Sequence, residues 1–142
     1  MNSDSKPATQ HFYLRLSNEG RTTKHGTPIP SEYLGAPVGV IAFRANANPG
    51  FVVVSGSMVS RKDTFVKKTG VAKALGRLNN DDTTLTLSLD ELKSISASDL
   101  AAKLGLYTRT GNHFAYVNWN RANSTKASAI ESFEARQAQV PA

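Results

Sequence analysis

The sequence predicts an α+β fold, with a mostly antiparallel sheet of about five to six strands and two to three helices. Short apolar runs with alternating or β-branched patterns recur along the chain, and stretches with helical spacing interrupt them without strict strand–helix alternation. A chain of 142 residues also fits one compact domain. We therefore expect a flexible, polar N-terminal tail over residues 1–10, followed by a single α+β domain over residues 11–140.

Three strands are expected before the most basic part of the chain. Residues 11–17 alternate apolar and polar side chains, as in a strand with one buried face. Residues 38–43 and 51–59 are largely apolar and β-branched, and the Asn, Pro and Gly residues at 46–50 favour a turn, so together they predict a β-hairpin. Residues 18–37 contain three Gly and three Pro and predict a long, exposed loop.

The second half of the chain predicts further strands and two helices. Residues 83–89 alternate Thr or Ser with Leu, which indicates a strand with one solvated face. Residues 96–104 begin with a Ser suited to an N-cap and fit a short helix. Residues 107–119 are typical of a second hairpin, which turns at Gly and Asn at 111–112. Residues 126–139 predict the C-terminal helix.

Positive charge is concentrated in one segment. The chain carries a net charge of +6, and residues 61–77 hold six basic residues against one acidic residue. Residues 60–78 predict an amphipathic helix that begins at a capping box formed by Ser60 and Asp63. The residues expected on its packing face are Phe65, Val71, Ala72, Leu75 and Leu78.

Three residues do not fit a simple amphipathic helix. Lys68 falls on the packing side, so either its stem runs outward or Gly70 breaks the helix in two. Gly70 and Gly76 each cost about 1 kcal/mol relative to Ala in a helix interior. Close approach of the backbone to another group, such as a phosphate, would explain them.

The basic segment is the candidate site for phosphates of nucleic acid or of a nucleotide. Lysine and arginine neutralise phosphates without reading sequence, which gives affinity that falls with salt. A solvated, solubilising helix face is the alternative reading of the same charges. The candidate residues are Arg61, Lys62, Lys67, Lys68, Lys73 and Arg77, with Lys62, Lys73 and Arg77 together on the outer face and Arg44 as an additional contact.

A resemblance involves the same segment. Its pattern is Asp63-x-Phe65-x-Lys67-Lys68-x-Gly70-x-x-x-Ala74-x-Gly76-Arg77-Leu78. It resembles a motif of small, uncharacterised accessory proteins of tailed bacteriophages, where it also follows an apolar strand. The resemblance covers about one eighth of the chain and implies a phage origin with a role directed at the host or at a genome. It implies no particular activity.

Two aromatic residues offer a second way to contact nucleic acid. Residues 114–119 are similar to the second part of an RNA-recognition-motif signature, although the Lys/Arg-Gly pair that opens the signature is absent. On a strand, Phe114 and Tyr116 would share one face, on which bases could stack. The same face could instead belong to the core.

Catalysis has little support in the sequence. The three histidines, His11, His25 and His113, are scattered, and the chain has no cysteine. We therefore expect no enzymatic activity, no catalytic residues, no cofactor and no metal site. The N-terminus has no apolar stretch of the signal-peptide type, and no segment has the length and apolar character of a membrane helix, so we expect a cytoplasmic protein, in the host cytoplasm if phage-encoded.

Two functions from different classes remain open. The leading hypothesis is a small, non-enzymatic accessory protein that binds nucleic acid or nucleotide phosphates through its basic helix. The alternative is a phage-encoded inhibitor whose basic helix docks on an acidic surface of a host protein, such as a transcription, restriction or other defence factor. Self-association through a strand edge is a third reading.

Overall fold

The structure is a computed structural model of the chain. It describes residues 9–17, 25–27, 35, 37–58, 66–78, 84–106, 114 and 117–138. The loop predicted over 18–37, the start of the predicted basic helix and most of the predicted second hairpin therefore lie largely outside the described residues.

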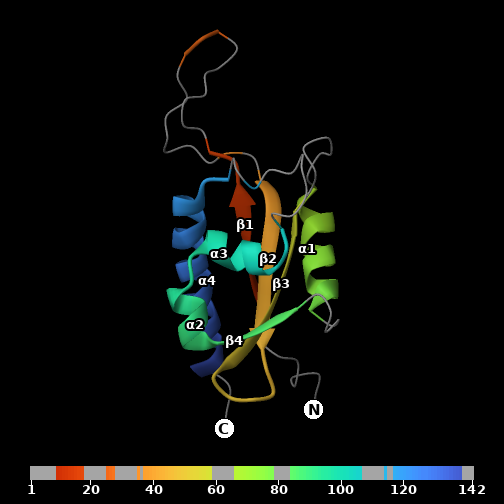
Figure 1. The fold of residues 1–142 in the computed structure, drawn as a ribbon, viewed down its shortest axis with the longest axis vertical. Coiled ribbons are helices and arrows are strands. Elements are labelled where there is room, and N and C mark those ends of the chain that lie inside the picture. The colour runs from red at the N-terminus through yellow and green to blue at the C-terminus, as the bar shows by residue number, and fades with distance from the viewer. Residues whose placement is uncertain are drawn as a thin grey trace.

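Four antiparallel strands form one sheet with the order β1-β2-β3-β4 (Figure 1). The strands are β1 (Thr9–Arg15), β2 (Pro37–Ala45), β3 (Phe51–Met58) and β4 (Leu85–Ser88). The predicted hairpin is confirmed: β2 pairs with β3 from the pair Gly39/Met58 to the pair Ala45/Val52, and the turn between them includes Gly50 with φ of +83°. That positive φ explains the choice of glycine there, because other residues adopt it at a cost.

Four helices cover the two faces of this sheet. Helix α1 (Lys67–Arg77) packs on one face, across β2 and β3, and is the only described helix there. Helices α2 (Leu89–Ser94), α3 (Ala97–Lys103) and α4 (Trp119–Ala138) cover the other face, as Figure 1 shows. The fold is therefore α+β as predicted, with four strands and four helices among the described residues against the predicted five to six strands and two to three helices.

The period of two along the strands divides the core between the two faces. Phe12, Ile41 and Phe43 point toward α2–α4 and belong to the main apolar cluster, in which Phe43 packs on Phe133 with ring centroids 5.4 Å apart. Val40 and Ala42, the alternate residues of β2, point toward α1. The α1 side holds a much smaller apolar cluster, so polar contacts must also hold α1 in place.

The start of α1 differs from the prediction. Val66 has extended backbone angles, φ −113° and ψ 116°, and the helix begins at Lys67. Its buried residues are Gly70 and Ala74, and the C-cap residue Leu78 is also buried, whereas Ala72, expected on the packing face, is exposed. The capping box at 60–63 and the packing of Phe65 lie outside the described residues.

The other boundaries shift by a few residues. The sheet begins at Thr9, so the last two residues of the predicted tail belong to β1. Leu89, predicted as the end of a strand, begins α2, because Ser88 caps that helix by accepting a hydrogen bond from the Glu91 N–H. Trp119, predicted in a hairpin strand, begins α4, and Val117 makes an isolated antiparallel bridge with Leu16. Helix α3 is confirmed, and Ser96 caps it.

Candidate phosphate-binding surface

Buried hydroxyl groups of the sheet attach α1 to β3. The Ser55 hydroxyl donates to the Ala74 carbonyl at 2.6 Å, and the Ser57 hydroxyl donates to the Gly70 carbonyl at 3.2 Å. Both serines are buried, so these hydrogen bonds satisfy groups that would otherwise be costly to remove from water. Gly70 is buried where its carbonyl accepts this bond. Gly76 is different, because a Cβ on it would meet no atom within 4 Å.

Two of the candidate arginines make hydrogen bonds within the protein. Arg77 donates to the Gly56 carbonyl at 2.6 Å, beyond the point at which β4 stops pairing with β3. Arg44 donates to the Leu78 carbonyl at 3.2 Å and so satisfies a carbonyl at the C-terminal end of α1. Both guanidinium groups thus help to fix α1 on the sheet, which sequence patterns alone do not reveal.

The lysines of α1 fall on two flanks of the helix. At 100° per residue, Lys73 lies about 40° from Arg77 around the helix axis, whereas Lys68 lies about 180° from it. Because Arg77 contacts β3, Lys73 belongs to the β3 flank and Lys68 to the opposite flank, on the side of β1. Both lysines are exposed. Lys68 therefore neither packs inward nor requires a break at Gly70.

A cluster of cations surrounds one aromatic ring of β1. The Lys67 Nζ atom lies 5.0 Å from the centroid of the Tyr13 ring, and the guanidinium carbon of Arg15 lies 5.6 Å from it. Arg15 also donates to the Gly35 carbonyl at 3.1 Å. Attraction between the cations and the ring brings two positive charges from distant parts of the chain together.

A groove continues this cluster along the edge of the sheet. It lies between β1 and α4 and has a volume of about 350 Å³. Arg15 lines it from β1, and Arg121 lines it from the first turn of α4. We call Arg15, Lys67, Lys68 and Arg121 the cationic surface. The described acidic residues all lie on α2, α3 or α4, and none lies on β1 or α1.

The predicted candidates are thus only partly brought together. Lys67 and Lys68 belong to the cationic surface, and Lys73 and Arg77 lie on the other flank of α1. Arg61 and Lys62 lie outside the described residues. The contribution of Tyr13 gave no separate signal in the sequence, because its cationic neighbour Lys67 is 54 residues away.

Phe114 lies in a different environment from the predicted stacking face. Its ring packs on Trp119 with centroids 4.9 Å apart, and its carbonyl accepts a hydrogen bond from the Trp119 indole N–H at 3.2 Å. The ring is half-buried against the main apolar cluster. Phe114 therefore packs on the core and does not present a stacking face. Its supposed partner in stacking, Tyr116, lies outside the described residues.

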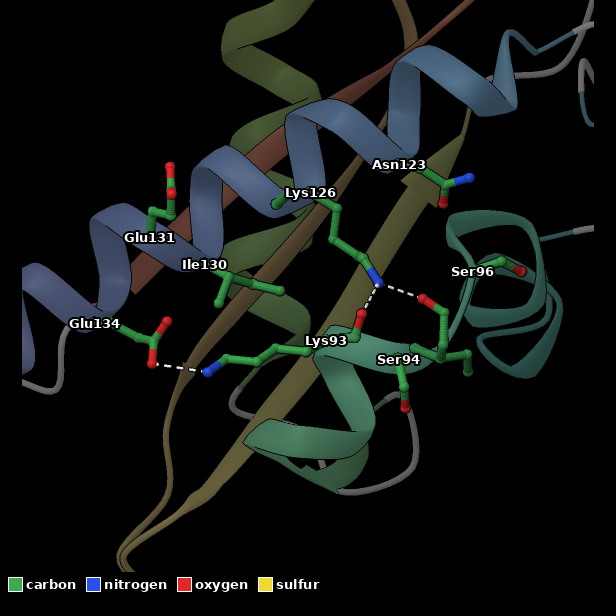
Figure 2. Close-up of a pocket in the computed structure, with 10 residues that line it drawn as sticks. Lys93, Ser94, Ser96, Asn123, Lys126, Ile130, Glu131 and Glu134 are labelled. Atoms are coloured by element: carbon green, nitrogen blue, oxygen red, sulfur yellow. Dashed lines mark hydrogen bonds and ion pairs between the residues drawn. The ribbon is translucent and has the colours of Figure 1, made fainter.

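A second pocket lies between α4 and the end of α2 (Figure 2). The ammonium group of Lys126 enters it and donates to the carbonyls of Leu92, Lys93 and Ile95. Burial lowers the pKa of Lys126 below the ordinary value of 10.5. An ammonium has three donors, and here all three have acceptors, so Lys126 fixes the C-terminal end of α2 and has no donor left for a ligand.

The described residues give few signs of other chemistry. No three of their His, Asp or Glu side chains are grouped so that they could hold a metal ion. No helix in the described ranges has both the length and the apolar character needed to cross a membrane. No known protein family, curated protein or solved structure matches this chain.

Proposed function

We propose that the protein binds nucleic acid through phosphates, using the cationic surface formed by Arg15, Lys67, Lys68 and Arg121. The observation that carries the proposal is the gathering of Lys67 and Arg15 around the Tyr13 ring. Like charges repel, so a cluster of cations with no described carboxylate on β1 or α1 favours the binding of an anion. Phosphates of a nucleic acid supply such anions at regular spacing.

The basic helix takes part through one flank only. Lys67 and Lys68 extend the cluster onto α1, whereas Arg44 and Arg77 contact the C-terminal end of α1 and the β3 backbone, away from Lys67. Contacts of this kind give affinity without base recognition, so binding is expected to tolerate changes of sequence. The phage setting implied by the resemblance agrees with a role directed at a genome and stays a prediction.

A matched pair of charge reversals on α1 tests the proposal. Lys68→Glu and Lys73→Glu change the same chemistry at two exposed positions of one helix. Affinity for fluorescein-labelled single-stranded DNA, duplex DNA and RNA is measured by anisotropy at low salt. We expect Lys68→Glu to lower affinity about tenfold and Lys73→Glu to lower it about twofold or less, because only Lys68 lies on the cationic surface.

Circular dichroism and urea unfolding of both variants control for changes in stability, which should be small at exposed positions. Equal losses in the two variants would place the contact on α1 as a whole and refute the assignment to one flank. Unchanged affinity in both variants, or no binding by the wild-type chain, would refute the proposal itself.

An acidic surface of a host protein is the second candidate partner. Val66, directly before Lys67, is 54% exposed, and an exposed aliphatic side chain beside cations suits a protein interface better than a phosphate backbone. Pull-down from host lysate with and without nuclease separates the two. A protein partner that persists after nuclease treatment and is lost in Val66→Ser would support this candidate.

A further inference from the structure

Hydrogen bonds connect both ends of β1 to α4 or to the residue directly before it. At one end, the Asn118 N–H donates to the Arg15 carbonyl at 2.8 Å, and at the other, Arg136 donates to the Thr9 carbonyl at 3.0 Å. The carbonyls at both ends of this strand edge are therefore already satisfied. An added β-strand, which needs a continuous row of free backbone groups, is disfavoured there, and a compact ligand fits better.

The wall formed by α4 presents one polar stripe. Arg121, Thr125, Ser128 and Ser132 line the groove, and their spacing keeps them within about 60° of one another around the helix axis. The Thr125 hydroxyl donates to carbonyls of its own helix at 3.2 Å and 3.1 Å. Ser128 and Ser132 are exposed and present hydroxyl groups beyond the arginine.

The opposite wall and the floor differ in character. Arg15 and His11 line the β1 side, while Phe12 and Ala129 are buried residues that line the groove. None of the ten lining residues is acidic. The groove thus combines two guanidinium groups and hydroxyl donors with a lining that is more apolar than polar. Its volume of about 350 Å³ is near the lower end of small-molecule sites, which is roughly 300 Å³.

We infer that this groove binds a phosphate monoester of a nucleotide. A monoester carries about −1.5 to −2 charges at pH 7, which two guanidinium groups neutralise, whereas a phosphodiester within a strand carries only one negative charge. Guanidinium groups also bind phosphate oxygens in pairs of hydrogen bonds. The terminal phosphate of a strand and a free mononucleotide share this chemistry. The inference rests on the proposed function and deepens it, since it names the chemical group that the β1 side of the cationic surface recognises.

The experiment compares two 12-nucleotide DNA strands of one sequence, labelled at the 3′ end, with either a 5′-phosphate or a 5′-hydroxyl group. We expect the full-length chain to bind the phosphorylated strand about fivefold more tightly. Arg121→Ala and Ser128→Asp should each reduce this ratio to about one, since the first removes a guanidinium and the second adds a negative charge to the groove. Lys68→Ala should weaken both strands and leave the ratio unchanged.

Adenosine monophosphate, inorganic phosphate and a Glu-rich peptide serve as competitors, with amide NMR shifts of His11, Arg121 and Ser128 as the local readout. If the mononucleotide competes with the strand and shifts the amide signals of these residues, the site is supported. A free nucleotide is then a second source of the phosphate monoester, besides the end of a strand. Equal affinity for the two strands overturns the groove site and leaves the proposed function standing. Nucleotide binding without strand binding refutes the proposed function alone. Binding of the peptide in the groove without any effect of phosphate overturns the inference.

Discussion

Replacing Lys126 with methionine tests the role assigned to the buried ammonium group. The side chain is only 4% exposed and donates to the carbonyls of Leu92, Lys93 and Ile95. Figure 2 shows the ammonium group in the pocket, with two of these bonds dashed. Met keeps most of the length and apolar stem of Lys but has no donor. The substitution therefore removes the hydrogen bonds at the end of α2 without leaving a large cavity.

The expected magnitude follows from two opposing effects. A buried carbonyl left without a donor costs about 1–3 kcal/mol, and this applies in full to Leu92, whose contact with the ammonium is buried. The carbonyls of Lys93 and Ile95 lie in partly buried contacts at the pocket, where water replaces part of the loss. Met also removes the cost of burying a charge. We expect a net loss of about 2 kcal/mol in the free energy of unfolding.

Urea unfolding followed by circular dichroism measures this loss. With a slope of about 1.5 kcal/mol per M, the midpoint should fall by about 1.3 M while the slope stays unchanged. Lys103→Met, at an exposed position in the last turn of α3, is the control and should change stability by less than about 0.5 kcal/mol. A Lys126→Met variant as stable as the wild type, or more stable, would contradict this expectation. It would show that the cost of burying the ammonium is at least as large as the stabilisation from its hydrogen bonds.

The same pair of proteins tests the direction of the pKa shift. Burial lowers the pKa of Lys126 in the folded chain, whereas in the unfolded chain the ordinary value of 10.5 applies. Between those two pKa values the unfolded chain binds more protons, so stability from this group rises with pH across that alkaline window. The difference in stability between wild type and Lys126→Met should therefore grow as pH rises toward 10.5. A difference that shrinks over this range would contradict the assigned direction.

Three further substitutions probe the fold. Gly76→Ala should stabilise the chain by about 0.5–1 kcal/mol in urea unfolding, because an added Cβ meets no atom within 4 Å, and a lower midpoint would contradict this packing. Gly39→Ala should cost about 1–3 kcal/mol, because its Cβ would lie 2.8 Å from the Ser57 carbonyl oxygen, and an unchanged midpoint would argue against the β2–β3 register. The hydrogen bond and charge of Glu134 raise the pKa of Lys93, so Glu134→Gln should lower that pKa in an NMR titration, while a constant value would rule out the pair.

The sequence was most informative where local patterns decide the structure. The β2–β3 hairpin follows from β-branched runs on either side of a turn, and α3 follows from its Ser96 cap. The start of α2 was also readable, because Ser88 and Glu91 have the spacing of a capping box, but the alternating leucines before them favoured a longer strand. Local patterns therefore predicted the elements better than their boundaries.

The candidate site depends on contacts that local patterns cannot show. Arg77 and Lys73 share one side of α1 in a helical projection, yet only the folded sheet reveals that the guanidinium of Arg77 bonds to a β3 carbonyl. Likewise, Lys67 and Arg15 are joined by the Tyr13 ring across 52 residues of sequence. The basic segment supplied the candidate charges, and the tertiary packing shows which of them lie on the same flank of α1.

The salt dependence of binding tests the cationic surface most directly. Four phosphate contacts, from Arg15, Lys67, Lys68 and Arg121, predict a slope of about −3 for the logarithm of single-stranded DNA affinity against the logarithm of salt concentration. The double variant Lys67→Ala/Lys68→Ala should reduce the slope to about −1.5, because two of the four contacts are lost. An affinity independent of salt, or a slope that the double variant leaves unchanged, would contradict phosphate binding by this surface.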